Sequence, residues 1–379
     1  PGNQSHSLRR KRQIKVCPTH PLCTMPASSV VKHPRRLLIL RFSALGDVAM
    51  TVPVVASLAA QYPRMQITVA SQPFLAPLFD RLAPNVQFFG ADIRKAYRGL
   101  RGLWQLSRTA PFQDCDAVAD LHDVLRTKIL RCFLRLRGKH LAVIDKHRRE
   151  KRLLVEHKIF RPLPTSFALY AETLARLGLP VKLNFERLKL GGDALHLPFP
   201  FSTDTLHEPW LGLAPFAAHE GKVYPLEQMA EVVQLYFESH PHGRLFVFGS
   251  RKEMEMLRPT WGKDFERLVF VCDILKGLDA ELQLMARLNV MVSMDSGNMH
   301  LASLVGCPVV SIWGQTHPFA GFMGYHQAEE NVVQQDLHCR PCSIFGNAPC
   351  RYGDFRCLRD ILPQLIIDKV EEIISPEQD

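Results

Sequence analysis

The sequence contains no apolar run close to the ~20 residues that a membrane-spanning helix requires. Residues 1–34 hold no acidic side chain, no apolar periodicity and no apolar core of a signal peptide, so we expect this basic segment to be disordered. No short tandem repeat is present. With 46% hydrophobic and 22% charged residues, the chain has the composition of ordinary globular proteins, and its 379 residues predict two domains.

The glycine fingerprint G-x-G-x-x-G, which marks the dinucleotide site of many sugar-nucleotide enzymes, is also missing after the first predicted strand. Residues 43–47 read Ser-Ala-Leu-Gly-Asp instead. The sequence therefore argues against an epimerase or another enzyme built on that fingerprint.

Cysteine pairs of the kind that bind structural zinc are scarce. Four neighbouring cysteines are Cys339, Cys342, Cys350 and Cys357. Only the first two form a short Cys-x2-Cys knuckle, whereas structural zinc sites usually contain two such knuckles. A structural metal and a locally packed loop both remain open, and the loop is favoured. Disulfides are disfavoured because we expect a reducing compartment.

Positive charge is abundant but unevenly placed. Residues 94–160 hold 17 Arg or Lys and 7 Asp or Glu, within a net charge of +10 for the whole chain. Solvated helix faces would account for this excess. A surface for an anionic partner, such as a phosphorylated glycolipid or the inner face of a membrane, would account for it as well.

Strands and helices alternate along two stretches of the chain. Strands are predicted at 37–42, 66–70, 86–89, 117–121, 210–214, 244–248, 268–271, 288–293 and 308–313. Helices are predicted at 47–61, 123–135, 225–239, 280–288 and 362–374. This alternation predicts an α/β protein with two doubly wound parallel sheets. We expect an N-terminal domain at 35–180, a linker at 181–208, a C-terminal domain at 209–362, and a terminal helix and tail at 363–379.

A carboxylate, a hydroxyl, a glycine and an imidazole stand where a predicted buried strand passes into a helix. Ligands of open α/β sheets bind at such places, and a helix N-terminus favours phosphate. Ser296 and the amides of Ser296 and Gly297 would receive a phosphate, with His300 over the same turn. Asp295 would repel it, and is expected to contact a sugar hydroxyl or to orient Lys222. An N-capping aspartate and a surface histidine are the simpler alternative.

A second turn of the same kind follows the first predicted strand. Gly46 permits a tight turn and a close approach of the backbone to a ligand. Asp47 begins the next predicted helix, where it would serve as an ordinary N-cap. Alternatively, it would project into a cleft as a general base that takes a proton from an acceptor hydroxyl.

Two further candidates follow strands of the C-terminal domain. Lys222 lies three residues before the helix-initiating Pro225, and its ammonium would neutralise a diphosphate leaving group; a solvated loop lysine is the alternative. Glu253 would hold a ribose hydroxyl or a base edge, although an ordinary acid in the first helical turn is slightly favoured. Asp114 and Asp116 form an Asp-x-Asp pair, but its place ahead of an N-terminal strand argues against metal binding.

Together these residues make the chain, from about residue 36 onward, resemble glycosyltransferase family nine, the ADP-heptose:lipopolysaccharide heptosyltransferases. The likeness begins with the strand and Ser-x-x-Gly-Asp turn of residues 37–53. It continues with Lys-Val-Tyr-Pro at 222–225, where the family has Lys-x-Trp-Pro. It ends with Asp-Ser-Gly-Asn-Met-His at 295–300 and Trp-Gly-Gln-Thr-His-Pro at 313–318. Each motif is weak alone, but their order and spacing are specific.

The resemblance implies a GT-B fold, two Rossmann-like domains across a cleft, and inverting sugar transfer without a metal or another cofactor. Asp47 would be the catalytic base, with Ser43 and Gly46 in its turn, and the N-terminal domain would bind the acceptor. The residues implied to hold the donor are Lys222, Glu253, Asp295, Ser296, Gly297 and His300.

The resemblance further implies transfer of heptose from ADP-heptose to an anionic lipopolysaccharide core acceptor. The enzyme would act in the cytoplasm, or peripherally at the inner face of the inner membrane of a Gram-negative bacterium, and nucleic acid is not an expected partner. Tyr224, in place of tryptophan, and the cysteine-rich segment suggest a branch whose donor sugar need not be heptose. Transfer of another nucleotide sugar to a different surface glycan is therefore the alternative, and a non-catalytic nucleotide-sugar-binding module is less favoured.

Overall fold

A computed structural model describes residues 33–191, 197, 209–265 and 267–375 of the chain. Nearly all of the basic segment predicted to be disordered lies outside these residues, and so does most of the predicted linker. Within the described residues, no helix has both the length and the apolar character needed to cross a membrane.

The N-terminal sheet has five parallel strands in the order β3-β2-β1-β4-β5. The strands are β1 (Arg36–Leu40), β2 (Gln66–Ser71), β3 (Val86–Gly90), β4 (Ala117–Asp120) and β5 (His140–Val143). Its helices are α1 (Leu45–Ala49), α2 (Val52–Gln61), η1 (Pro73–Leu78), α3 (Gly99–Leu106), α4 (Ala110–Asp114), α5 (Leu125–Leu136), α6 (Arg148–Val155) and α7 (Ser166–Ala175). Strand β5 was not predicted from the sequence; it begins with an exposed histidine, and only one of its residues is buried.

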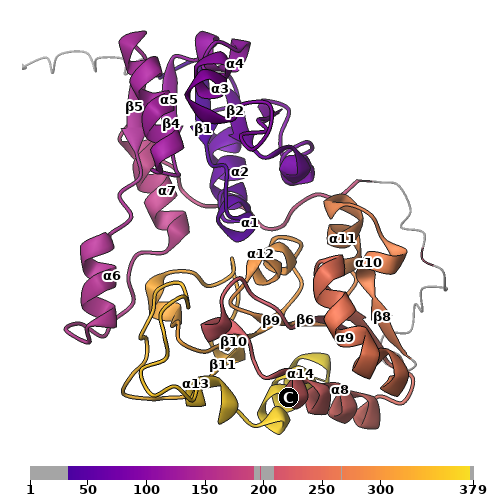
Figure 1. Cartoon of the computed structure of the whole chain (residues 1–379). Coiled ribbons are helices and arrows are strands. Elements are labelled where there is room, and N and C mark those ends of the chain that lie inside the picture. Colours follow the sequence, from indigo (N-terminus) through magenta and orange to yellow (C-terminus); the bar gives the residue numbers. More distant parts are fainter. Residues whose placement is uncertain (1–32, 192–196, 198–208, 266, 376–379) are drawn as a thin grey trace, which may run out of the picture. The chain divides into compact units, whose positions relative to one another are not determined.

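Side chains of β1 alternate between the two faces of this sheet. Leu37 and Ile39 join the core that contains α2 and α7, while Leu38 and Leu40 join the core under α3, α4 and α5. Burial of both faces accounts for the continuous apolar run in the sequence, as in other parallel sheets. The expected doubly wound architecture is therefore confirmed, and the alternation of helices with strands can be followed in Figure 1.

The C-terminal sheet has six parallel strands in the order β11-β10-β9-β6-β7-β8. The strands are β6 (Trp210–Ala214), β7 (Arg244–Val247), β8 (Leu268–Phe270), β9 (Val290–Met294), β10 (Val309–Trp313) and β11 (Val332–Gln334). Its helices are η2 (Glu220–Lys222), α8 (Leu226–Ser239), α9 (Arg251–Asp264), α10 (Val271–Ile274), α11 (Leu278–Met285), α12 (Gly297–Leu304), η3 (Pro318–Ala320), η4 (Glu329–Asn331), α13 (Arg356–Arg359) and α14 (Pro363–Ile374). Only β11, a strand of three residues, has no counterpart among the predicted strands of this domain.

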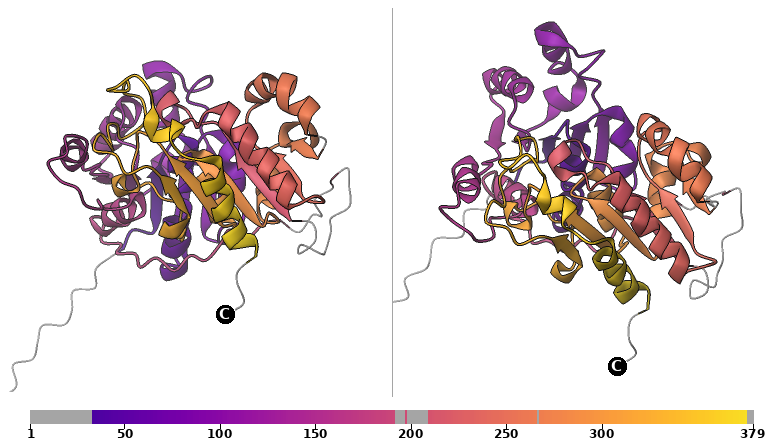
Figure 2. Two further views of the ribbon diagram at one scale, coloured as in Figure 1. Left: turned by 90° about the horizontal axis from the view of Figure 1, so that it is seen from below. Right: turned by 60° about the horizontal axis from the view of Figure 1, so that its bottom comes forward.

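The last helix belongs to the packing of the C-terminal sheet. Ile366, Ile367 and Val370 of α14 share one core with Val232 and Val233 of α8. Figure 2 shows the two helices side by side in both views. The amphipathic pattern that predicted α14 thus reflects burial against α8 and the sheet.

The single helix predicted at 47–61 is divided in two. The first part, α1, ends at Ala49, and α2 begins at Val52 with Pro53 in its first turn. Proline has no N–H and its ring clashes with a preceding helical turn, so it suits the start of a helix and not its interior. The division leaves Asp47 in a short helix of its own.

Residues 181–191, which make up nearly all of the described part of the predicted linker, have no regular structure but are packed. Gln61 donates a hydrogen bond to the carbonyl oxygen of Lys182 (2.7 Å), and the N–H of Leu188 donates to the carbonyl oxygen of Leu304 (2.6 Å). Phe185 and Leu188 are buried in a core that also takes in residues of both sheets. One hydrophobic core therefore continues from the N-terminal sheet to the C-terminal sheet.

Residues 148–166 precede the linker in sequence yet bond to the C-terminal half. The N–H of Leu163 donates to the carbonyl oxygen of Phe319 (2.9 Å), and that of Ser166 donates to the carbonyl oxygen of Gly321 (3.0 Å). Leu154 of α6 shares a small core with Leu163 and Ala320. We call residues 148–166 the α6 arm, and it fastens one half of the molecule to the other.

Candidate active site

The candidate residues gather where the strand order of each sheet reverses. In the N-terminal sheet, helix α1 after β1 carries Asp47, and the loop after β4 carries His122. In the C-terminal sheet, the loops after β6 and β9 carry Lys222 and Asp295. The carboxyl ends of neighbouring parallel strands at such a reversal are the usual ligand sites of open α/β sheets.

Two cavities of about 230 Å³ each meet at Asp47. The first, which we call the N-terminal cavity, is lined among others by Arg41, Ser43, His122, Lys146, Lys151 and Tyr170. The second, which we call the inter-domain cavity, is lined among others by Gly46, His219, Lys222, Asp295, Ser296, Gly297 and His300. Four residues line both cavities: Ala44, Asp47, Phe322 and Phe345.

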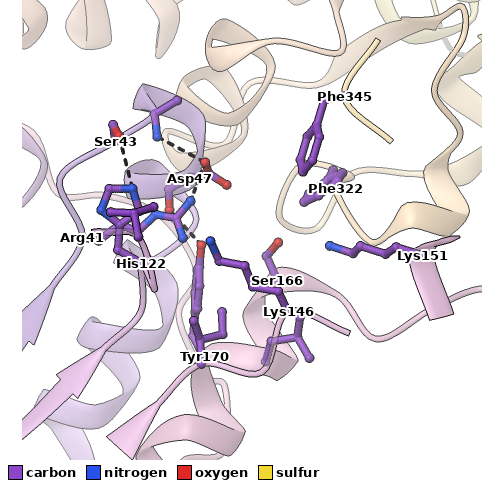
Figure 3. Close-up of a pocket in the computed structure, with 14 residues that line it drawn as sticks. Arg41, Ser43, Asp47, His122, Lys146, Lys151, Ser166, Tyr170, Phe322 and Phe345 are labelled. Atoms are coloured by element: carbon purple, nitrogen blue, oxygen red, sulfur yellow. Dashed lines mark hydrogen bonds and ion pairs between the residues drawn. The ribbon is translucent and has the colours of Figure 1, made fainter. Parts of the chain in front are cut away.

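Asp47 is the third residue of α1, and the N-cap position belongs to Ala44. The Asp47 Oδ2 atom accepts the N–H of Ala44 (3.2 Å) and lies 2.5 Å from a guanidinium nitrogen of Arg41. Burial alone would raise the pKa of Asp47, but Arg41 and the Ala44 N–H outweigh it and hold this pKa below its ordinary value. The side chain is 30% exposed, so an ionised carboxylate faces the cavities (Figure 3).

Arg41 is a site residue that the sequence analysis did not single out. It is buried directly after β1 and donates a hydrogen bond to the carbonyl oxygen of Leu121 (2.5 Å). From another side, the Tyr170 hydroxyl donates to the backbone carbonyl oxygen of Asp47 (3.2 Å). The signal in the sequence was an arginine within the predicted strand 37–42, where a buried charge requires a partner.

Ser43 contacts a neutral histidine. Its hydroxyl lies 3.3 Å from Nε2 of His122, and the N–H of Phe42 donates to Nδ1 of the same ring (3.4 Å). Burial and the neighbouring Arg41 lower the pKa of His122 to about 3. His122 is therefore uncharged at neutral pH and acts as a hydrogen-bonding part of the cavity wall.

Lys222 and Asp295 form an ion pair that is mostly buried. Lys222 Nζ lies 2.8 Å from Asp295 Oδ2, and the side chains are 14% and 4% exposed. Of the two contacts expected for Asp295, the structure shows the one with Lys222. The N-cap of α12 is Ser296, so the simpler capping role for Asp295 is not observed. The Ser296 hydroxyl lies 3.3 Å from that of Ser293.

His300 is buried against α1. It is 5% exposed, and burial lowers its pKa to about 4, so the imidazole is neutral at neutral pH. A Cβ atom on Gly46 would lie 2.6 Å from Cδ2 of His300. Gly46 is helical in α1, so it makes room for His300 and does not form the tight turn that we expected. The surface position considered for His300 is also wrong.

Glu253 is not brought to either cavity. Its carboxylate accepts hydrogen bonds from the N–H and the hydroxyl of Ser250 (2.7 Å each), and Ser250 is the N-cap of α9. This reciprocal capping is the ordinary role of an acid at the third position of a helix. The donor-binding role implied for Glu253 by the resemblance therefore has no geometric support.

Two other sequence features are structural. Tyr224 is fully buried, and its hydroxyl donates to the carbonyl oxygen of Ile361 (2.7 Å). The replacement of the family's tryptophan by Tyr224 therefore concerns packing, and it gives no information on the donor sugar. One carboxylate oxygen of Asp116 accepts the N–H groups of Arg35 and Arg36 (2.9 Å each). Asp116 thereby fixes the start of β1, at the opposite end of that strand from Asp47.

The cysteine-rich segment contributes an aromatic wall to the site. Phe345 is 55% exposed, and its ring centroid lies 6.0 Å from that of Phe322, which lines the same two cavities. Ser343 holds the turn, since its hydroxyl accepts the N–H of Gly346 (2.9 Å). A Cβ atom on Gly346 would lie 2.5 Å from Cγ of Lys222, so this turn also packs against the stem of that lysine.

The cysteines of this segment are unpaired, and in the described part of the chain no three or more candidate ligands are grouped so that they could hold a metal ion. The segment is held by Arg340, a buried residue that sequence reasoning did not single out. Its guanidinium donates to the carbonyl oxygens of Thr316 (2.8 Å) and Trp313 (3.1 Å). These contacts are those of a locally packed loop.

Comparison with known proteins agrees with this arrangement. The model of glycosyltransferase family 9 (heptosyltransferase) matches residues 106–348. A lipopolysaccharide core heptosyltransferase of Haemophilus influenzae is 24% identical over 303 residues, which cover 75% of this chain and 80% of that protein.

Solved structures carry the same fold. The ADP-heptose lps heptosyltransferase II of E. coli matches with a TM-score of 0.61 and 19% identity, over 91% of this chain and 100% of that one. An E. coli heptosyltransferase solved with ADP matches with a TM-score of 0.56 and 18% identity, over 89% of this chain and 99% of that one. The expected GT-B fold is therefore confirmed.

Proposed function

The chain belongs to glycosyltransferase family 9, the heptosyltransferase family, and from this premise we propose that it transfers heptose from ADP-heptose to a lipopolysaccharide core acceptor. The observation that carries the proposal is the position of Asp47, an ionised carboxylate on the wall shared by two cavities. The Haemophilus influenzae relative supports the class of acceptor, and the E. coli structure with ADP supports the donor nucleotide.

In this proposal the donor diphosphate occupies the inter-domain cavity. Lys222 and the N-terminal end of α12, at Ser296 and Gly297, line that cavity and present positive charge and N–H groups. Asp295 keeps the ammonium of Lys222 in place. His300 is neutral and would add a hydrogen bond. Because this set supplies charge stabilisation by itself, we expect transfer to continue in the presence of a metal chelator.

The acceptor hydroxyl lies against Asp47 from the N-terminal cavity. Its oxygen bonds to the anomeric carbon while the bond from that carbon to the diphosphate oxygen breaks, and ADP leaves with the bonding electrons. The hydroxyl proton passes to the Asp47 carboxylate. Attack on the face opposite the diphosphate inverts the anomeric configuration. Arg41 keeps the carboxylate ionised and oriented.

The variant Asp47→Asn tests this assignment. It keeps the shape of the side chain but cannot accept the proton, so we expect kcat to fall by about 10²–10⁴-fold. The affinity for ADP should remain close to that of the wild type, because Lys222 and α12 are unchanged. The measurements are ADP release with a mass spectrum of the acceptor product, and calorimetric titration with ADP. Glu253→Gln is the matched control and should transfer normally.

Three outcomes would contradict parts of the proposal. Wild-type turnover by Asp47→Asn would exclude the base. Preferential turnover of another nucleotide sugar would favour a different donor. Binding of ADP-heptose by the wild type without transfer to any core acceptor would favour a non-catalytic binding module.

We also propose that the enzyme meets its acceptor at the inner face of the inner membrane. Helices α3 and α5 contact each other, and the exposed side chains on them include Leu100, Trp104 and Leu136 within the basic stretch 94–160. Basic residues beside exposed apolar ones are typical of surfaces that bind anionic lipids. Sedimentation with anionic vesicles, but not with neutral ones, is the expected result. Equal recovery with both would contradict it.

A further inference from the structure

We propose that Cys342 and Cys350 form a reversible disulfide that closes the turn carrying Phe345, with a low-molecular-weight disulfide of the glutathione class as the oxidant. This site for thiol–disulfide exchange goes beyond the proposed function. Only its effect on sugar transfer rests on that function, because the effect requires the two cavities to hold the substrates.

The thiols of the cysteine-rich segment are unpaired in the structure and lie close enough to influence one another. Burial raises the pKa of Cys342, and negative charge on Cys339 or Cys350 raises it further. Burial also raises the pKa of Cys357 to about 12, and charge on the other three thiols acts in the same direction. The segment therefore gathers several oxidisable sulfur atoms in one place.

Cys342 and Cys350 stand on either side of one tight turn. The hydroxyl of Ser343 accepts the N–H of Gly346 (2.9 Å) and that of Asn347 (3.2 Å). The chain between the two cysteines is therefore folded back on itself and is not extended, as a disulfide across it requires. A bond between the two sulfur atoms would close residues 343–349 into a ring.

Cys350 has the properties of an attacking thiol. Burial opposes its ionisation, but the N–H groups of residues 352–355 outweigh burial and lower its pKa below the ordinary value. The thiolate is the nucleophile in exchange, and Cys350 is partly exposed, so a dissolved disulfide can reach it. Cys342 is also partly exposed but has a raised pKa, which suits it to be the second thiol to react.

The exchange takes place in two steps. The Cys350 thiolate bonds to one sulfur of the small disulfide, whose S–S bond breaks, and the other half leaves as a thiolate. The Cys342 thiolate then bonds to Cys350 Sγ, and the second half leaves with the bonding electrons. Two protein thiols are thus oxidised, and their two protons pass to the two released thiolates. In a reducing compartment the reverse reaction keeps the protein thiols free.

The disulfide would fix a turn that contacts both halves of the site. Phe345 lines both cavities, where Figure 3 shows it beside Phe322, and Gly346 packs against the stem of Lys222. In the reduced state the turn is held by hydrogen bonds to Ser343, which water can replace. Covalent closure removes that freedom. Because both substrates would lie against the Phe345 ring, their entry and the release of products should slow.

The test is to equilibrate the wild type with mixtures of reduced and oxidised glutathione, alkylate the free thiols, and assign the bond by peptide mass spectrometry. We expect rising oxidised glutathione to protect Cys342 and Cys350 from alkylation and to remove two hydrogen atoms from the mass of the segment. Dithiothreitol should restore both thiols. Cys350→Ser should not form the disulfide. Cys132→Ser, which removes an exposed thiol of α5, should form it as the wild type does.

Four results would overturn the inference. One is full alkylation of both thiols even when oxidised glutathione predominates. Another is a mixed disulfide on Cys350 that Cys342 does not displace. A third is a disulfide between a different pair of cysteines in the segment. The last is a metal ion, found by elemental analysis of the purified protein, that shields the thiols of the segment from alkylation.

The transfer rate gives a second readout. Oxidation should lower kcat of the wild type several-fold, and dithiothreitol should restore it. Cys350→Ser should transfer at the rate of the reduced wild type in both mixtures, and an unchanged ADP affinity shows that this variant is folded. An equal loss in both proteins, or an unchanged wild-type rate once the disulfide has formed, would overturn the effect on transfer. If the reduced wild type transfers no sugar, the proposed function fails while the mass spectra still decide the disulfide.

Discussion

At the scale of single residues, each carboxylate of the site is held by a cation from its own half of the molecule. Asp47 is paired with Arg41, and Asp295 is paired with Lys222. The guanidinium of Arg41 keeps the Asp47 carboxylate ionised, and in both pairs the cation fixes the direction of the carboxylate. Because the two side chains contact each other, substitution of one partner alters the position of the other. The effects of substituting the two members of a pair should therefore not be additive.

The Lys222 and Asp295 pair offers a direct check of this dependence. We expect Lys222→Ala to weaken ADP binding by about 1–3 kcal/mol, because a charge-assisted contact to the diphosphate is lost. Asp295→Asn should cost less, since the ammonium remains but is no longer held. Calorimetry on both single variants and the double variant should show a double-variant loss smaller than the sum of the two single losses. Additive losses would indicate that the pair does not act as a unit, and Lys158→Ala serves as the control.

Much of the candidate site could be predicted from the sequence, because its residues occur in short patterns at strand ends. Asp47, Lys222 and His300 follow strands β1, β6 and β9, and a parallel sheet brings such ends to one edge. Lys151 and Phe345 could not be found in this way. Each lies in a segment without a strand-end pattern, and it reaches the site only through the packing of that segment.

At the scale of elements, the contact between α1 and α12 depends on glycine. Cβ atoms on Gly46 and Gly297 would lie 2.6 Å from His300 and 3.0 Å from Leu45, respectively. The two helices that carry the proposed base and the proposed phosphate site therefore approach as closely as their backbones allow. This contact sets how far Asp47 lies from the proposed phosphate site at the start of α12.

We expect Gly46→Ala to lower both stability and activity. The added methyl group must displace the buried His300 ring. We expect this overpacking to lower the free energy of unfolding by about 1–3 kcal/mol. Denaturant unfolding and the transfer assay would measure the two effects. Gly262→Ala is a matched control in α9, where the nearest atom to a new Cβ is 3.8 Å away, and it should be neutral or stabilising. Normal activity in Gly46→Ala would show that α1 and α12 need not be this close.

The elements that were not predicted from the sequence include strands β5 and β11 and helices such as α3, α7 and α9. Strand β5 begins with an exposed histidine, and strand β11 contains only two apolar residues, Val332 and Val333. The break between α1 and α2 was not predicted, because the apolar spacing continues across it. Pro53 lies in the first turn of α2, where a proline is compatible with the start of a new helix. In these cases, contacts with neighbouring elements or backbone geometry determine the secondary structure, and the hydrophobic pattern alone does not predict it.

At the scale of the whole molecule, the two sheets share a hydrophobic core. Ile39 of β1, Phe185 of the linker and Leu304 of α12 all belong to it. The two Rossmann-like halves of the described chain are thus joined by buried apolar contacts as well as by the bonded α6 arm. Neither half would bury its inner surface alone.

This sharing predicts a single cooperative unfolding transition. Calorimetry should show one unfolding transition, and ADP should raise its midpoint temperature without splitting it. A ligand bound to one half stabilises every part that unfolds together with that half. Hydrogen exchange should show slower exchange with ADP in β1 and β4 as well as in β6 and β9. Two transitions, of which ADP moves only one, would contradict this expectation.

The aromatic wall has a consequence for how such an enzyme diversifies. Phe322 and Phe345 line both cavities, and Phe345 lies in the cysteine-rich segment. If the inter-domain cavity takes the donor and the N-terminal cavity takes the acceptor, as proposed, one substitution in that segment changes the room for both. On the proposed function, donor and acceptor preferences would then change together at this position, so selection on one of them would also be selection on the other.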